Sequence, residues 1–183
     1  IYPVFHPAYI LRNPGMLESY GQTFDGLEKL IVEGVPEAVS TSYRLSEDLD
    51  QLYEAIIEAR EAGVVAYDIE TSHLHPKMPG AKFVSFALSW GEQSAFGFSL
   101  TAKNYDGALT LLHDHLLEDA SVLKVMHHAK FELMWSMSIG RLIFNFADTM
   151  LFHWHLDERN RTHGLKELAL QHTDMGFYDA ELE

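Results

Sequence analysis

The sequence predicts an α/β protein in which helices flank a mixed β-sheet. Segments with helical apolar spacing alternate with short apolar runs typical of buried strands, and no internal repeat or low-complexity tract interrupts them. Their order is helix, three strands, helix, strand, helix, short strand, helix, helix, which favours a sheet covered by helices. The 183 residues are 47% hydrophobic and 22% charged, as expected for a globular domain with a well-packed core.

The first helix of the sheet domain is predicted to begin at Ser46 and to end at Gly63. Ser46 is a favourable N-cap, and Glu47 and Asp48 follow it where the positive end of the helix dipole favours acids. Glycine is a common residue at a helix C-terminus. The apolar positions between them recur at helical spacing: Leu49, Leu52, Tyr53, Ile56 and Ile57.

The strands and the remaining helices follow in order along the chain. Strands are predicted over Val64–Tyr67, Lys82–Trp90, Gln93–Leu100, Val122–Met126 and, as a short fifth strand, Phe144–Ala147. Gly91-Glu92 predicts a hairpin-like turn between the second and third of these strands. Helices are predicted over Gly107–Glu118, Lys130–Ser138, Asp148–Leu156 and Leu165–His172.

The organisation of the chain changes near residue 35. Residues 1–34 contain Pro3, Pro7, Pro14 and Gly15 and one helix-like run at Phe24–Val32, and a short break follows them. We therefore expect residues 1–34 to be a short N-terminal appendage and residues 35–183 to form the main domain. Because the chain begins at Ile1 without an initiator Met, we expect it to be part of a longer protein.

Charge and cysteine content exclude several classes of function. Thirteen Lys and Arg against 27 Asp and Glu give a net charge of −14, which argues against a protein that coats nucleic acid through a basic surface. An enzyme that holds nucleic acid through metal ions is compatible with this charge. The absence of cysteine excludes disulfides, thiolate catalysis and Cys-ligated zinc. No apolar run approaches the roughly 20 residues of a membrane span, so no membrane partner is expected.

Two carboxylates follow the strand Val64–Tyr67 directly. Residues two apart in a strand point to the same side, so Asp68 and Glu70 are predicted to share one face. Such a pair suits Mg²⁺ or Mn²⁺, which prefer oxygen ligands. A solvated strand end is the alternative for this short motif.

A third carboxylate, Glu132, lies near the start of the helix after Val122–Met126. If that strand neighbours Val64–Tyr67, Glu132 can point at Asp68 and Glu70, and three such carboxylates repel one another unless cations neutralise them. A zinc hydrolase built on histidines is the alternative enzyme. It has no His-Glu-x-x-His motif here, and the pairs His153/His155 and His113/His115 lie two apart on helices and so point to different faces.

Four motifs in order carry a family resemblance: Tyr67-Asp68-Ile69-Glu70-Thr71, His127–Leu133, Phe146-Ala147-Asp148-Thr149-Met150, and Gly164-Leu165-Lys166-Glu167-Leu168-Ala169. The chain resembles DEDD-type 3′–5′ exonucleases, especially the proofreading domains of phage-like family A DNA polymerases. The resemblance implies a ribonuclease H-like fold and hydrolysis of the 3′-terminal phosphodiester with two Mg²⁺ or Mn²⁺ ions. It implies as partners a single-stranded 3′ end of DNA and a polymerase domain of the parent chain, in the cytoplasm of a bacterium or phage-infected host.

The resemblance also assigns roles to residues. It implies that Asp68, Glu70 and Glu132 are the catalytic, metal-binding carboxylates, and it places Asp148 as the cap of the helix that follows it. The residues expected to contact substrate are Thr71, His128, Lys130, Phe131, Arg161 and Lys166.

The sequence departs from the family in two motifs. His128 and Glu132 stand where the family usually has Asn and Asp, and no convincing Tyr-x-x-x-Asp motif follows the last helix. We expect the final ligand to lie beyond Glu183, with Asp174, Asp179 or Glu181 as alternatives. A non-catalytic ribonuclease H-like scaffold that guides a strand is the competing class of function.

A second resemblance covers the N-terminal appendage. Tyr2–Pro14 reads Tyr-Pro-Val-Phe-His-Pro-Ala-Tyr-Ile-Leu-Arg-Asn-Pro and is similar to the closing motif of family 4-type uracil-DNA glycosylases. It implies that residues 1–34 are the tail of a fused upstream domain. The alternative is a Pro-rich arm that packs on the exonuclease fold.

Overall fold

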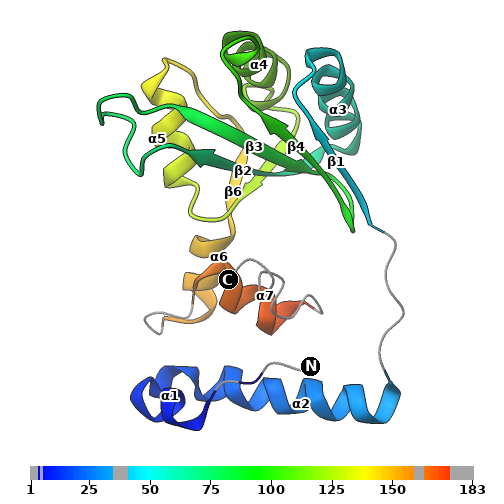
Figure 1. The fold of residues 1–183 in the computed structure, drawn as a ribbon, viewed down its shortest axis with the longest axis vertical. Coiled ribbons are helices and arrows are strands. Elements are labelled where there is room, and N and C mark those ends of the chain that lie inside the picture. Colours follow the sequence, from blue (N-terminus) through cyan, green and yellow to red (C-terminus); the bar gives the residue numbers. More distant parts are fainter. Residues whose placement is uncertain (1–3, 5, 35–40, 159–162, 174–183) are drawn as a thin grey trace. The chain divides into compact units, whose positions relative to one another are not determined.

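The computed structural model describes residues 4, 6–34, 41–158 and 163–173 (Figure 1). The chain forms two compact units. One comprises Val39–Thr149, and the other combines Ile1–Ala38 with Met150–Glu183. The first unit contains the sheet and the predicted carboxylates, and each unit is described below by itself.

The first unit is built on a six-stranded mixed sheet in the order β1-β4-β3-β2-β5-β6 (Figure 1). Its strands are β1 (Ser42–Ser46), β2 (Val64–Thr71), β3 (Phe83–Ser89), β4 (Ser94–Ser99), β5 (Leu123–Met126) and β6 (Phe146–Asp148). The strands β2, β3 and β4 form an antiparallel meander, whereas β1 pairs with β4, β5 with β2 and β6 with β5 in parallel. This arrangement confirms the predicted mixed α/β sheet.

Helices α3 (Leu49–Ala62), α4 (Tyr105–Leu112) and α5 (Lys130–Ser138) lie beside the sheet (Figure 1), and all three contribute to one core with its buried side chains. Along β2 the burial alternates, with Val65, Tyr67 and Ile69 buried and the residues between them exposed. The α3 side chains Leu52 and Ile56 are fully buried in the same core. Burial of such side chains stabilises the fold by about 1.5–3 kcal/mol each.

The loop before β5 is fixed by a buried lysine. Lys124 is fully buried, and its Nζ donates to the carbonyl oxygens of Asp119 at 2.6 Å and Val122 at 2.9 Å. Desolvation lowers the pKa of Lys124 to about 8. These bonds satisfy the buried amine and tie the loop to the strand that precedes α5.

The predicted elements are confirmed with shifts of a few residues, and three details were wrong. The N-cap of α3 is Asp48, not Ser46: its Oδ1 accepts from the backbone N–H of Asp50 at 2.9 Å and of Gln51 at 3.1 Å. Ser46 instead ends β1, an edge strand that was not predicted.

The third difference is in the helix predicted over Gly107–Glu118. It is α-helical only as far as Leu112 and continues as a π-helical turn, η2 (His113–Leu117). The backbone N–H of Glu118 donates to the carbonyl of His113, five residues earlier.

The second unit is helical. It contains α1 (Pro7–Arg12), the 3₁₀ turn η1 (Pro14–Met16), α2 (Leu17–Glu33), most of α6 (Thr149–Leu156) and α7 (Leu165–His172), and α2 packs against α7. The predicted run Phe24–Val32 lies within α2. His6 caps α1 by accepting the N–H of Ala8 on its Nδ1 at 3.1 Å. Among the described residues, no helix has the length and apolar character needed to span a membrane.

Candidate active site

The two carboxylates of the first motif lie on the central strand β2. Asp68 and Glu70 are both exposed, on the face opposite the buried Tyr67 and Ile69, so the prediction that they share a face is confirmed. Partial desolvation by the surrounding strand residues first, and the charge of the neighbouring Glu70 second, raise the pKa of Asp68 above its usual value. A register shift between Glu70 and Thr71 ends the regular pairing with β3 just beyond the pair.

Glu132 occupies the first turn of α5 and is almost completely buried, with 2% of its surface exposed. Its Oε2 has no hydrogen-bond partner within the described part of the chain. Burial raises the pKa of Glu132 to about 7, and the nearby charges of Asp68 and Asp148 act in the same direction. A buried carboxylate oxygen without a partner is costly, and a bound cation would remove that cost.

The strand pairing explains why these groups are neighbours. β5 pairs with β2 in parallel, so the two strands are neighbours and the start of α5 lies at the end of β2 that carries Asp68. Tyr67 is buried beside them. Burial and the charges of Glu132 and Asp68 raise the pKa of its hydroxyl, so Tyr67 is neutral throughout the physiological range.

The turn between β5 and α5 is held by Asp148 at the end of β6. Its Oδ1 accepts the backbone N–H of His128 at 3.0 Å, and its Oδ2 accepts that of Ala129 at 2.9 Å. Asp148 therefore supports the start of α5. Sequence spacing could not indicate this role, since it depends on the pairing of β6 with β5. Its predicted role as the cap of the helix that follows it stays a prediction.

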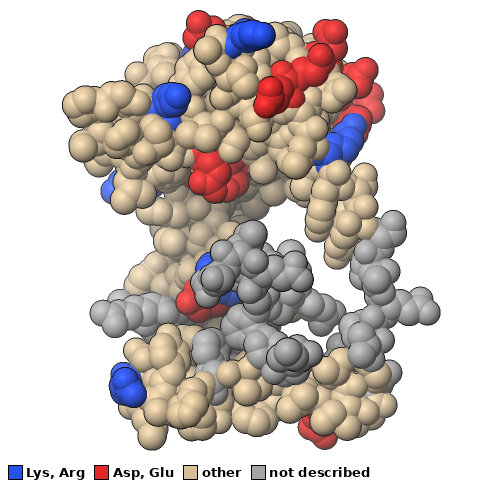
Figure 2. Space-filling model, in the orientation of Figure 1, with Lys and Arg blue, Asp and Glu red and all other residues tan. Residues whose placement is uncertain are grey.

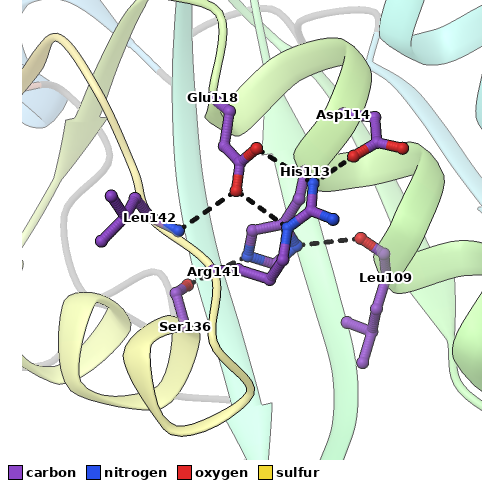
Figure 3. Close-up of polar contacts among 7 residues, drawn as sticks. All are labelled: Leu109, His113, Asp114, Glu118, Ser136, Arg141 and Leu142. Atoms are coloured by element: carbon purple, nitrogen blue, oxygen red, sulfur yellow. Dashed lines mark hydrogen bonds and ion pairs between the residues drawn. The ribbon is translucent and has the colours of Figure 1, made fainter.

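The opposite end of α5 is anchored by a buried polar cluster on η2 (Figure 3). His113 is fully buried; its Nδ1 lies 2.9 Å from the carbonyl of Leu109 and its Nε2 lies 3.2 Å from the hydroxyl of Ser136 in α5. Because a carbonyl only accepts, Nδ1 carries the proton and Nε2 accepts from Ser136. Desolvation lowers the pKa of His113, which keeps it neutral and structural.

Arg141 extends this cluster just after α5. Its guanidinium pairs with Asp114 and, at 2.8 Å, with Glu118, whose Oε1 also accepts the N–H of Leu142 at 3.2 Å (Figure 3). The helix that carries Glu132 is thus fixed at both ends. Nothing in the spacing of these residues predicted that they would meet.

The donor chemistry fits a divalent metal ion, whereas the spacing of the side chains is not that of a preformed cluster. Asp68, Glu70 and Glu132 offer the hard oxygen ligands that Mg²⁺ and Mn²⁺ prefer. In the described ranges, however, no group of three or more His, Asp and Glu side chains is placed to hold one ion. The structure has an exposed pair on β2 and one buried carboxylate on α5, and the predicted meeting of the three at one ion stays a prediction.

The histidines do not form the alternative zinc site in the residues that the structure describes. His153 is buried and its Nδ1 lies 2.7 Å from Nδ1 of His163, while His155 is exposed on another side of α6. This confirms that His153 and His155 point apart. The pairing of His153 with His163 was not foreseen.

The remaining predicted contact residues lie in several places. The hydroxyl of Thr71 donates to the carbonyl of His73 at 2.8 Å. His128 and Lys130 are exposed at the start of α5, and Phe131 is half-buried with its ring 6.3 Å from that of Trp135. Lys166 is exposed on α7 in the second unit, and Arg161 lies outside the described residues.

The face drawn in Figure 2 carries its Lys and Arg side chains singly, interspersed with acidic side chains. No broad basic patch of described residues appears on this face. Electrostatic attraction alone therefore does not hold a polynucleotide there, in agreement with the net charge of −14.

Several solved structures share the fold of this chain. Escherichia coli RNase D, an exoribonuclease involved in structured RNA processing, is 17% identical with a TM-score of 0.59 over 78% of this chain and 36% of that one. Trypanosoma brucei RNase D in complex with RNA U12 is 16% identical with a TM-score of 0.62 over 75% and 48%. Brucella melitensis NrnC with bound Mg²⁺ is 20% identical with a TM-score of 0.52 over 75% and 64%. At these identities the likeness shows the fold, and it confirms the ribonuclease H-like class.

Sequence comparison shows the family. The DNA polymerase of Escherichia phage T5 is 31% identical over 97% of this chain and 21% of its own length. DNA polymerase I of Rhizobium leguminosarum is 31% identical over 76% of this chain and 16% of its own length. This chain thus spans about a fifth or less of these relatives. A family model described as 3′–5′ exonuclease matches residues 43–182, which include β2, α5 and all three carboxylates, and the chain belongs to this 3′–5′ exonuclease domain family of family A DNA polymerases.

Proposed function

We propose that this chain is the proofreading module of a DNA polymerase and removes nucleotides from the 3′ end of single-stranded DNA. The observation that carries the proposal is the exposed pair Asp68 and Glu70 beside the buried Glu132, whose Oε2 has no partner among the described residues. Both polymerase relatives support DNA as the substrate.

The metal-binding part of the proposal rests on the same three residues. Asp68, Glu70 and Glu132 would hold Mg²⁺ or Mn²⁺, and bound ions would supply an acidified water and charge neutralisation at the leaving oxygen. Asp68 and Glu70 are accessible to a substrate phosphate because they are exposed. Glu132, with its pKa of about 7, changes from a neutral to a charged ligand near neutral pH.

Residues around the start of α5 are proposed to hold the terminal nucleotide. Lys130 is exposed and offers a cation to a phosphate, and the half-buried ring of Phe131 offers an aromatic face to a base. Thr71, which follows Glu70 on β2, and His128, in the turn before α5, are further proposed contacts, as are Lys166 and Arg161. Stacking on an aromatic side chain contributes about 1–3 kcal/mol per base.

The test is digestion of labelled single-stranded oligonucleotides with Mg²⁺ or Mn²⁺. We expect a chain extended beyond Glu183 to shorten a free 3′ DNA end stepwise and the 183-residue chain to do so very slowly or not at all. A 3′-blocked end should resist, and Asp68→Ala in the extended chain should abolish shortening. Glu61→Gln, which changes an exposed carboxylate on α3, is the matched control and should digest at the unmodified rate. The assay includes a chain extended beyond Glu183, because the resemblance implies a Tyr and an Asp after α7.

Two outcomes would contradict the proposal. Faster digestion of an RNA oligonucleotide of the same sequence would reassign the substrate. Lack of divalent-ion binding together with lack of digestion in both chains would favour the non-catalytic scaffold.

A further inference from the structure

The turn between β5 and α5 has a backbone conformation that requires support. His128 lies in this turn with a φ of 64°, in the left-handed region that favours glycine. The turn is nevertheless followed directly by the helix that carries Glu132. Such a conformation persists only where surrounding contacts enforce it.

Two consecutive residues supply these contacts: Asp148, which ends β6, and Thr149, which begins α6. Asp148 is buried, and each of its carboxylate oxygens accepts one backbone N–H, from His128 at 3.0 Å and from Ala129 at 2.9 Å. The hydroxyl of Thr149 donates to the carbonyl of Met126 at 3.3 Å and lies 2.9 Å from Nδ1 of His127. This pair, the Asp148–Thr149 clamp, contacts four successive residues of the turn.

The clamp determines where α5 begins. The first-turn bonds of α5 start from the clamped residues, with the N–H of Phe131 donating to the carbonyl of His128 at 2.9 Å and that of Leu133 to the carbonyl of Ala129 at 3.0 Å. Glu132 lies between these two donors. A displacement of the clamped turn therefore moves the carboxyl of Glu132 relative to Asp68 on β2.

We propose that Asp148 is a positioning residue that holds Glu132 in place for metal binding through the backbone N–H groups of His128 and Ala129. The inference rests on the proposed function, because it assumes that Glu132 is a metal ligand. It adds that Asp148, the acid of the third motif, acts through the protein backbone. Misplacement of a catalytic group by about 1 Å is enough to lower a rate by about 10²-fold.

The experiment measures Mn²⁺ affinity of the chain by calorimetric titration in a double-mutant cycle. Asp148→Asn has nearly the same shape but turns one acceptor oxygen into a donor amide, so one of the two N–H groups loses its acceptor. We expect Asp148→Asn to weaken Mn²⁺ binding at least about fivefold and Glu132→Gln to weaken it at least about tenfold. If Asp148 acts through Glu132, the double variant binds as weakly as Glu132→Gln alone.

Two controls separate positioning from general loss of stability. Asp119→Asn removes a carboxylate that accepts from the backbone and hydroxyl of Ser121 in a loop of the same unit, and it should lower the melting temperature without changing Mn²⁺ affinity. Thr149→Val weakens the clamp while leaving Asp148 intact, so it should give a smaller loss of affinity if Asp148→Asn does not fold.

The outcomes distinguish the positioning role from the proposed function. The positioning role would be overturned if Asp148→Asn lowered Mn²⁺ affinity equally with and without Glu132→Gln. It would also be overturned if Mn²⁺ affinity were unchanged in Asp148→Asn or, should that variant not fold, in Thr149→Val. Unchanged affinity in Glu132→Gln would overturn the proposed metal site itself, and the positioning role with it.

Discussion

At the scale of single residues, Glu132 makes the stability of the domain depend on pH. Its pKa rises from 4.5 to about 7 on folding, so between these values the folded state binds more protons than the unfolded state. The free energy of unfolding that this group contributes is therefore full below pH 4.5 and falls as pH rises to about 7. Without metal, the domain keeps an uncompensated buried charge above that pH.

Glu132→Gln should remove this penalty. We expect the variant to match the unmodified chain near pH 4.5 and to exceed it above pH 7 by about 2 kcal/mol, after allowance for solvent screening. Denaturant unfolding in a chelator across pH 4.5–8 measures the difference. Glu61→Gln should show no such trend, and a difference that shrinks as pH rises would contradict the assigned burial of Glu132.

Asp68 and Glu70 give a second prediction at this scale. Asp68→Ala and Glu70→Ala should each abolish measurable Mn²⁺ binding in calorimetry, because the exposed pair supplies the accessible ligands. Each should also raise the melting temperature of the metal-free chain slightly, since Glu70 contributes to the raised pKa of Asp68. Unchanged Mn²⁺ affinity in both variants would show that the ions bind elsewhere.

At the scale of elements, α5 is the helix whose anchoring matters most to the site. Ser136→Ala removes the hydroxyl that donates to the buried Nε2 of His113 and leaves that acceptor without its partner. We expect a loss of about 1–2 kcal/mol in unfolding free energy. Ser138→Ala is the matched control, because its hydroxyl donates to the carbonyl of Trp135 within the same helix. Equal stability of the two variants would contradict the anchoring role of His113.

The elements also show which parts of the structure the sequence could predict. The period-two placement of Asp68 and Glu70 and the bounds of α5 are local properties, and both were predicted correctly. The edge strand β1 was not predicted, because none of its five residues is fully buried. A strand that buries no side chains does not need the alternating apolar residues by which a strand is recognised in a sequence. The roles of Asp148 and His113 depend on which strands and helices become neighbours, and a single sequence does not specify those pairs.

At the scale of the whole molecule, the net charge of −14 bears on how the proposed DNA substrate would bind. An acidic protein that binds a polyanion through metal ions and a few cations releases few counterions. We expect a nuclease-resistant 3′ phosphorothioate oligonucleotide to bind only with Mg²⁺ present, with a slope of log affinity against log salt smaller than about 2 in magnitude. Fluorescence anisotropy in Mg²⁺ and in a chelator checks this, and tight binding in chelator would contradict it.

The N-terminal residues 1–34 belong to the second of the two compact units. The assignment of residues 1–34 as the tail of a glycosylase-like upstream domain stays a prediction. In the structure the described part of this segment forms α1 and α2, and α2 packs against α7 within one compact unit. Lys166 lies in that unit, and the three carboxylates lie in the other.

The π-helical turn at His113–Leu117 has a consequence for comparing this protein with its relatives. A π turn contains one residue more than the α turn it replaces, so a relative with a regular helix here would align with a gap of one residue. Deletion of one residue from the π turn would rotate the preceding part of the helix by about 100° about its axis. This rotation would carry the imidazole of His113 away from Ser136. A one-residue length difference at this point therefore indicates whether a relative keeps the histidine–serine bond, even where the neighbouring residues differ.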